Sequence, residues 1–270
     1  MTITSHKKLP VIIAVSCALW PQAVLAGASK WDETMGARLR IVTEDPQPGS
    51  ETLRAILQID LESGWKTYWR EPGASGIPPK IDAVSGASAA DVHFPVPHWV
   101  DQSYGSWAGY TEPVSLPITF ALEPDATALS ASVFLGICHD VCVPVTGQID
   151  VPLGASSGSA LQAIQVDAAF AGLPGGNTEA LSIGKPGWTE GGLLEIRVAH
   201  DDGDGETQLF LAAGEGRGFK KPVVADESAG ETVFRAEPLF DPAEAGGFAL
   251  TAAARHGLDT AEVTAEVAAP

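Results

Sequence analysis

The sequence predicts an all-β protein, and three patterns lead to this expectation. Apolar and polar residues alternate with a period of two in several short runs, as expected for half-buried strands. Gly and Pro separate these runs, and prolines such as Pro72, Pro95 and Pro97 exclude long helices. The first runs cover residues 37–42, 53–61 and 114–120. Several such runs between Trp31 and Pro152 are typical of a β-sandwich or barrel.

Two β domains are expected, joined by a short helix. We assign residues 27–155 to the first domain and residues 156–176 to a linker that starts in a flexible Gly- and Ser-rich stretch. Within this linker the spacing predicts a helix over residues 160–170, with Leu161, Ile164 and Ala168 on one face. A second, smaller β domain is predicted for residues 177–270. Its strand-like runs cover residues 193–198, 208–211, 231–235 and 247–252.

The first 26 residues have the features of a secretory signal peptide. Lys7 and Lys8 precede a short apolar core at residues 11–20, and residues 24–26 (VLA) place small side chains at the −3 and −1 positions of a cleavage site. The apolar run is too short to cross a bilayer, which takes about 20 residues. An uncleaved anchor or a buried N-terminal strand is the alternative. We expect cleavage after Ala26, no further transmembrane segment, and a location outside the cytoplasm.

Charge and composition exclude several classes of protein. The 270 residues include 16 Lys and Arg against 34 Asp and Glu, a net charge of −18 that becomes −20 once residues 1–26 are removed. Nucleic acid is therefore not expected as a partner, because phosphate binding needs clustered basic residues. A hydrophobic fraction of 45% argues against a disordered chain. Nucleophile-elbow, phosphate-loop and dinucleotide-binding motifs are missing from the sequence, and we expect no cofactor.

The cysteines are the most informative residues in the chain. Cys17 is expected to leave with the signal peptide, so that Cys138 and Cys142 remain. In an extended strand their Cα atoms would lie roughly 13 Å apart, too far for a disulfide. A bond therefore requires a turn at residues 139–141, with the cysteines at the tip or flanks of a hairpin. Pro144 would either keep the following strand at a sheet edge or cap its start.

Three functions are compatible with this pair. A short, accessible bridge is typical of thiol–disulfide exchange, and a protonated His139 would favour the thiolate whereas Asp140 would oppose it. The second function is a purely structural bridge, within an adaptor whose second domain makes the contacts. The third function is Cu(I) binding by Cys138, His139 and Cys142, since two sulfurs and an imidazole suit a soft metal. His93 and His98 are further candidate ligands, although packed or surface histidines are more common.

Motifs spread over the first domain resemble those of a known family. In order along the chain they are residues 64–73 (GWKTYWREPG), 76–79 (GIPP), 94–97 (FPVP), 101–105 (DQSYG), 109–110 (GY), 116–118 (LPI) and 142–144 (CVP). Together they resemble the N-terminal periplasmic domain of the thiol:disulfide interchange protein DsbD, and more closely the related suppressor of copper sensitivity proteins. The resemblance covers approximately residues 30 to 155.

The resemblance implies an immunoglobulin-like β-sandwich in the periplasm. Cys138 and Cys142 would be its redox pair, receiving electrons from a membrane-embedded thiol donor and passing them to oxidised periplasmic proteins. A protein that serves others damaged by copper is a related possibility. Residues 101–105, with Asp101, Ser103 and Tyr104, would form a cap loop over the pair. The residues expected to border the site are Tyr68, Trp69, Trp99, Trp107 and His139.

This chain departs from the family pattern at the cap and at the cysteines. Ser103 stands where the best-known member has an aromatic residue, so shielding of the sulfurs would fall to Tyr104, Trp99 or Trp107. The spacing between the two cysteines is also shorter than in that member. The multi-span membrane region and the thioredoxin-like domain of full-length members have no counterpart here, so we expect either a free-standing module or one that lacks its usual fusion partners.

Overall fold

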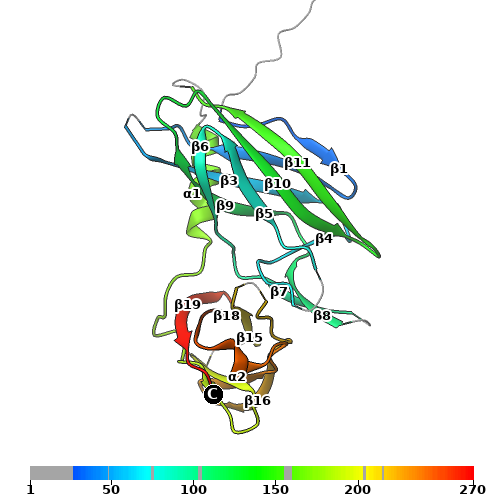
Figure 1. Ribbon diagram of the computed structural model, residues 1–270, viewed down its shortest axis with the longest axis vertical. Helices are drawn as coiled ribbons and strands as arrows, with labels where there is room; N and C mark the ends of the chain where they lie inside the picture. Colours follow the sequence, from blue (N-terminus) through cyan, green and yellow to red (C-terminus); the bar gives the residue numbers. More distant parts are fainter. Residues whose placement is uncertain are drawn as a thin grey trace, which may run out of the picture.

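The computed structural model describes residues 27–47, 49–73, 76–102, 105–154, 160–202, 205–214 and 216–270. The predicted signal segment, and Ser103 and Tyr104 of the predicted cap loop, lie outside these ranges. The described chain is nearly all β, as the sequence predicted, and forms two units with separate cores (Figure 1). None of its helices is long and apolar enough to cross a membrane.

The first unit is a sandwich of two mainly antiparallel sheets. One sheet has the order β1-β2-β3-β9-β6. Its strands are β1 (Asp32–Thr34), β2 (Ala37–Thr43), β3 (Thr52–Leu61), β6 (Ala87–Val92) and β9 (Val114–Leu122). The strands predicted at residues 37–42, 53–61 and 114–120 are thus confirmed.

The other sheet carries the cysteines. Its order is β11-β10-β4-β8-β7, and β5 also pairs with β10. The strands are β4 (Lys66–Tyr68), β5 (Lys80–Ser85), β7 (His98–Gln102), β8 (Gly105–Tyr110), β10 (Ala128–Cys138) and β11 (Cys142–Pro152). Alternate residues of both sheets meet in one core, to which Ile41, Leu57, Ile118, Val133 and Leu135 belong, all without exposed surface.

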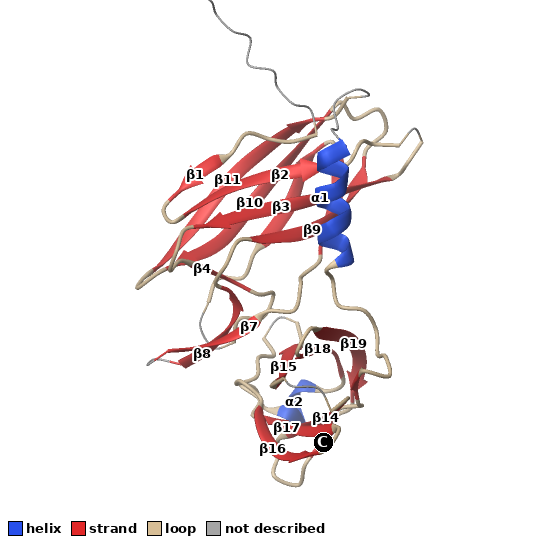
Figure 2. Ribbon diagram, turned by 180° about the vertical axis from the view of Figure 1, so that it is seen from behind, coloured by secondary structure: helices blue, strands red, loops and turns tan. Residues whose placement is uncertain are grey.

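The linking helix packs against the first unit. Helix α1 (Ala160–Ala171) lies along the outer face of the first sheet (Figure 2), where its buried Val166 contacts Val42 and Ile56. The helix itself was predicted correctly, but its apolar face was not: Leu161 and Ile164 are each 62% exposed. Apolar residues occur on both sides of this Ala-rich helix, so periodicity alone does not identify the side that meets the sheet.

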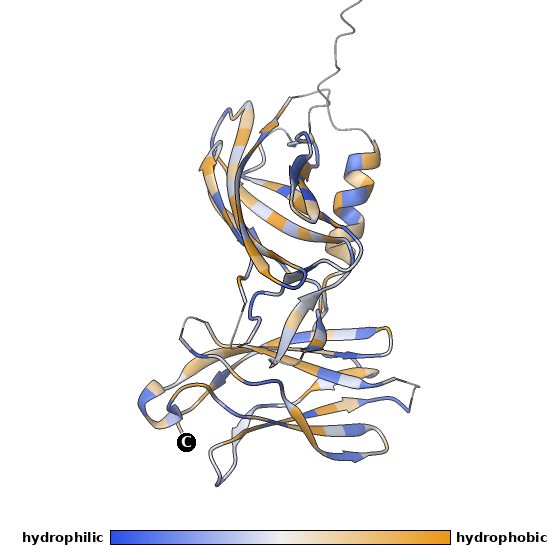
Figure 3. Ribbon diagram, turned by 90° about the vertical axis from the view of Figure 1, so that its right-hand side faces the viewer, coloured by the Kyte–Doolittle hydropathy of each residue, from blue (hydrophilic) through white to orange (hydrophobic). Residues whose placement is uncertain are grey.

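The second unit is built from two smaller sheets. The first has the order β12-β14-β17-β16, with β13 paired to β14, and the second has the order β15-β18-β19. Its elements are β12 (Leu181–Ile183), β13 (Gly187–Trp188), β14 (Leu194–His200), β15 (Thr207–Ala212), β16 (Val223–Ser228), β17 (Glu231–Ala236), α2 (Pro242–Ala245), β18 (Phe248–His256) and β19 (Asp259–Val267). Apolar and polar residues alternate along the strands of both units (Figure 3), as the sequence runs predicted.

An aromatic contact joins the two units. The ring of Phe210, on β15, is fully buried against Trp69 and stacks on Trp99, with centroid distances of 6.0 and 5.3 Å. The Trp99 indole N–H also donates to the Leu209 carbonyl at 3.0 Å. Phe210 therefore belongs to the core of the first unit although it comes from the second.

Charged groups surround this aromatic contact. Arg70 forms an ion pair with Glu262 at 3.0 Å, and Lys221 pairs with Asp101 at 2.9 Å. Two motif residues of the first unit, Arg70 and Asp101, are thus held by side chains of the second.

Candidate functional site

The cysteines lie on either side of a tight turn. Cys138 ends β10, Cys142 begins β11, and the two residues are directly opposite each other in the antiparallel ladder. Their Cα atoms are 4.1 Å apart and their sulfurs form a disulfide. The hairpin predicted from the sequence is therefore confirmed. Strand β11, which contains Pro144, lies at the edge of its sheet, which is the first of the two positions expected for a strand with this proline.

The two cysteines have different access to solvent. Cys138 is fully buried, packed with Tyr68 and Trp107, whereas Cys142 is exposed. The turn residues that follow Cys138, from His139 to Val141, are exposed as well. An incoming group therefore meets Cys142 first.

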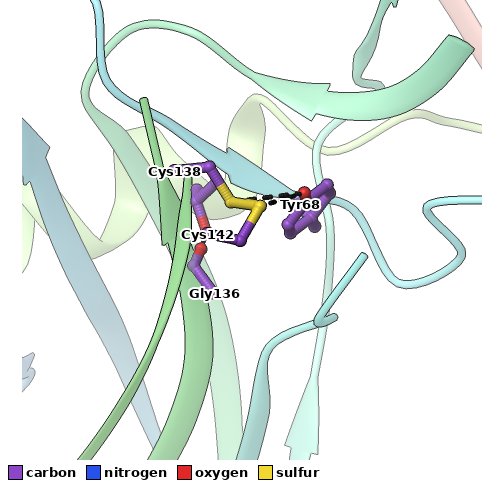
Figure 4. Close-up of a disulfide and its surroundings, with 5 residues drawn as sticks. Tyr68, Gly136, Cys138 and Cys142 are labelled. Atoms are coloured by element: carbon purple, nitrogen blue, oxygen red, sulfur yellow. Dashed lines mark hydrogen bonds between the residues drawn. A yellow bond between two sulfur atoms is a disulfide. The ribbon is translucent and has the colours of Figure 1, made fainter. Parts of the chain in front are cut away.

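Tyr68, at the end of β4, points its hydroxyl at the disulfide (Figure 4). Its oxygen lies 2.8 Å from Cys142 Sγ and 3.2 Å from Cys138 Sγ. A disulfide sulfur carries no proton, so the hydroxyl is the donor and the sulfurs are the acceptors. Tyr68 thus provides a polar group at the bond that would break on reduction.

Glycines make room for the Tyr68 ring. A Cβ on Gly136 would lie 3.1 Å from Tyr68 Cε2 and 2.9 Å from Ile77 Cβ. A Cβ on Gly76 would lie 2.9 Å from Tyr68 Cε1, and one on Gly109 would lie 3.0 Å from Tyr68 Cα. The backbone N–H of Gly136 donates to the Ile77 carbonyl at 3.1 Å, which holds that side of the slot. The ring therefore has little freedom to turn away from the sulfurs.

Trp107, on β8, packs against Tyr68 and the buried Cys138. Its ring meets Tyr68 edge to face, with a centroid distance of 5.2 Å, and it is almost fully buried. Lys66 places its ammonium 5.3 Å from the centre of the same ring. Tyr68 and Trp107, both predicted to border the site, are therefore brought together with the cysteines.

His139 is close to the cysteines but turns toward other groups. Its ring lies 5.5 Å from that of Trp65, and its Nδ1 is 2.9 Å from the carboxylate of Asp140. His93 is paired with Thr119, and His98 is hydrogen-bonded to Arg255. Within the described ranges, His, Cys, Asp and Glu side chains form no group of three that could hold a metal ion. In the disulfide form described here, Cys138, His139 and Cys142 are not gathered as metal ligands, and a Cu(I) site in the reduced protein stays a prediction.

The remaining predicted site residues lie elsewhere or outside the described ranges. Trp69 follows Tyr68 in the chain and lies in the main core, against Phe210. Trp99 faces the second unit. Asp101 is exposed and accepts hydrogen bonds from Ser106 at 2.5 Å and from Lys221; these bonds hold the pKa of its carboxyl below the usual range.

Sequence reasoning passed over two features of this site. In the sequence, Lys66 and the glycines around Tyr68 stood out only as parts of longer motifs, and they were not predicted to belong to the site. The spacing of Lys66 and Tyr68, two residues apart in a strand, is the signal that places both on one face. The glycines gave a weaker signal, because many glycines in this chain occur in ordinary turns.

Comparison with known proteins agrees with this geometry. Residues 40–153 match the family model of the thiol:disulfide interchange protein DsbD, N-terminal. A crystal structure of the N-terminal periplasmic domain of ScsB from Proteus mirabilis has a similar fold, with a TM-score of 0.77 and 20% sequence identity. The match covers 91% of this chain and 100% of the other, and thus includes both units. No curated protein shows significant sequence similarity to the chain. The family match thus falls on the first sandwich, where the sequence motifs that resemble this family also lie.

Proposed function

We propose that this protein is a periplasmic thiol–disulfide interchange module of the protein-disulfide reductase type. The Cys138–Cys142 pair would take electrons from a membrane-embedded thiol donor and pass them to oxidised periplasmic proteins. The observation that carries the proposal is a disulfide between one exposed and one buried cysteine at the tip of a hairpin. The family match over residues 40–153 supports the same class of chemistry.

In the first half-reaction the pair is reduced. A donor thiolate attacks the exposed Cys142 sulfur, the intramolecular S–S bond breaks, and Cys138 leaves as a thiolate. A second donor thiolate then attacks the donor sulfur of the mixed disulfide and releases Cys142. Two electrons have moved, the donor is a disulfide, and the module carries two thiols once protons are taken up from water.

In the second half-reaction the pair is oxidised by a protein disulfide. The Cys142 thiolate attacks one sulfur of the partner's disulfide, and the partner's other sulfur leaves as a thiolate. Cys138 then attacks Cys142, which restores the internal disulfide and releases the partner as a dithiol. Burial suits Cys138 to this resolving role, since it is shielded from partners but adjacent to Cys142.

Tyr68 assists whenever a thiolate forms. Its hydroxyl is already within hydrogen-bond distance of both sulfurs, so it needs no rearrangement to donate to a charged one. Hydrogen bonds to charged acceptors are about twice as strong as those between neutral groups. Tyr68 would therefore stabilise the leaving sulfur more than the intact bridge.

Trapping of mixed disulfides tests this function. With Cys138→Ser, the exposed Cys142 should form a stable mixed disulfide with an oxidised protein substrate, because the resolving thiol is gone. With Cys142→Ser, the buried Cys138 should form little mixed disulfide, and the double variant should form no mixed disulfide. Equal trapping by both single variants, or by neither, would contradict the assignment of Cys142 as the attacking sulfur.

A further inference from the structure

Three residues form a row across the cysteine-bearing sheet. On β11, β10 and β4, Cys142 is directly opposite Cys138, and Cys138 is directly opposite Lys66. Directly opposite residues of antiparallel strands project to the same face, with Cβ atoms about 4.5–5.5 Å apart. The Lys66 side chain therefore leaves the sheet on the side of the two sulfurs.

The position of Lys66 is unusual for a lysine. The residue is only 6% exposed, and its ammonium lies over the ring of Trp107. Within the described part of the chain, no carboxylate is within ion-pair distance of this ammonium. Burial lowers the pKa of Lys66, and the more distant, exposed Asp140 carboxylate acts in the opposite direction. A cation that is mostly withdrawn from water is stabilised by any anion that forms beside it.

The site produces such an anion on reduction. The intact disulfide is uncharged, whereas a dithiol loses a proton to become a thiolate, which is both the nucleophile and the leaving group in exchange. We propose that the Lys66 ammonium stabilises the cysteine thiolate, lowering the thiol pKa and making the pair a stronger oxidant. This proposal rests on the proposed interchange function and assigns to it a charged residue that acts through space, without proton or group transfer by the lysine.

The alternative is that Lys66 only fills space. A buried lysine can stabilise a protein through the packing of its four-carbon stem alone. The two roles are separable because Met has a similar length and no charge. Lys66→Met keeps the packing and removes the ammonium, while Lys66→Arg restores a positive charge. Lys66→Gln provides a second neutral variant should the Met variant not fold.

The test measures the more acidic thiol of the chemically reduced protein. Thiolate absorbance or the rate of alkylation by iodoacetamide is followed from about pH 4 to pH 10 for the wild type and the three variants. A nearby opposite charge shifts a pKa by about one pH unit or more, so we expect Lys66→Met and Lys66→Gln to raise the thiol pKa by roughly one pH unit. Lys66→Arg should bring the thiol pKa most of the way back to the wild-type value. The control is Lys80→Met, in β5 of the same sheet, whose exposed ammonium pairs with Asp82 and should leave the pKa unchanged.

The reduction potential gives a second readout. A tenfold loss of thiolate stabilisation makes a two-electron pair more reducing by about 30 mV. We expect this difference between Lys66→Met and the wild type above the thiol pKa. It should vanish at pH values where both thiols are protonated, because a neutral thiol gains little from the charge. A packing role would give a difference that does not depend on pH.

The proposal is overturned if both neutral variants and the wild type share one thiol pKa. It is equally overturned if Lys66→Arg fails to lower the pKa relative to Lys66→Met. Because the titration uses protein reduced by a strong reductant, it does not depend on the interchange function. A wild-type bridge that resists physiological reductants would reject the proposed function and leave the effect of Lys66 on the thiol pKa as a separate result.

Discussion

The hydroxyl of Tyr68 lies 2.8 Å from Cys142 Sγ and 3.2 Å from Cys138 Sγ, so one donor serves both sulfurs of the disulfide. Gly76 and Gly136, where a Cβ would meet ring atoms of Tyr68, leave just enough space for the ring in this place. A hydroxyl group with little freedom to move thus lies beside a disulfide that joins a buried cysteine, Cys138, to an exposed one, Cys142.

Removing the Tyr68 hydroxyl should destabilise the cysteine thiolate more than it destabilises the folded protein. A hydrogen bond to a charged group contributes about 1.5–3 kcal/mol, whereas a disulfide sulfur is a weak acceptor. We therefore expect Tyr68→Phe to raise the thiol pKa by about one pH unit, with a loss of less than about 1 kcal/mol in the free energy of unfolding of the oxidised protein. Thiol titration and urea unfolding check this. An unchanged thiol pKa would show that the hydroxyl does not reach the reduced sulfurs.

Narrowing the glycine slot should displace Tyr68. In Gly136→Ala the new methyl group would lie 2.9 Å from Ile77 Cβ and 3.1 Å from Tyr68 Cε2, so one of these neighbours must move. Overpacking of this kind costs about 1–3 kcal/mol, and we expect the reduction potential to change as well. Gly176→Ala is the control, because its Cβ would meet nothing within 4 Å. Equal stability of the two variants by urea unfolding would contradict the tight fit.

The contact between the units should depend on one ring. Phe210 is fully buried between Trp69 and Trp99, and loss of a buried Phe side chain costs about 3–5 kcal/mol. We expect Phe210→Ala to lower the free energy of unfolding by that amount and to change the tryptophan fluorescence. Phe134→Ala is the control, since Phe134 is 39% exposed. Similar losses for the two variants would mean that Phe210 does not hold the units together.

Acid should weaken the same contact through His98. Burial and the neighbouring Arg255 guanidinium lower the pKa of His98, while Glu112 opposes them. The unfolded chain, whose histidines titrate near pH 6.5, therefore binds this proton at a higher pH than the folded protein does. The free energy of unfolding should fall as the pH drops below about 6.5, and the loss should be complete once the pH passes the lowered pKa of the folded state.

His98 is partly exposed, so we expect a change below about 1 kcal/mol. Urea unfolding of the wild type and of His98→Gln, at about pH 7.5 and pH 5, isolates the contribution of this residue. The variant should lose less stability on acidification than the wild type. The same pH dependence in both proteins would assign the effect to other groups.

The features that depend on local pattern were predictable from the sequence. Alternation at residues 114–120 became strand β9 (Val114–Leu122), because one face of each strand is buried. The four-residue separation of Cys138 and Cys142 required a turn, which the structure contains. The family motifs then pointed to the class of chemistry, and residues 40–153 match that family.

The features that depend on long-range register were not predictable in the same way. Lys66 is a neighbour of Cys138 only because β4 pairs with β10, which a single sequence does not reveal. Trp99 was expected near the sulfurs, yet it faces Phe210, more than a hundred residues away in the chain. Adjacent strand residues point to opposite faces, which is why Tyr68 meets the disulfide and Trp69 meets the core.

The reduction potential of the Cys138–Cys142 pair, determined by thiol trapping in glutathione or dithiothreitol buffers, distinguishes an exchange pair from a structural bridge. Structural disulfides in secreted proteins have potentials below about −300 mV, whereas exchange proteins lie above that value. We expect a two-electron midpoint above about −300 mV, in the range where donors and oxidised proteins can exchange electrons with the pair. A bridge that stays oxidised below about −300 mV would contradict the account and identify the disulfide as structural.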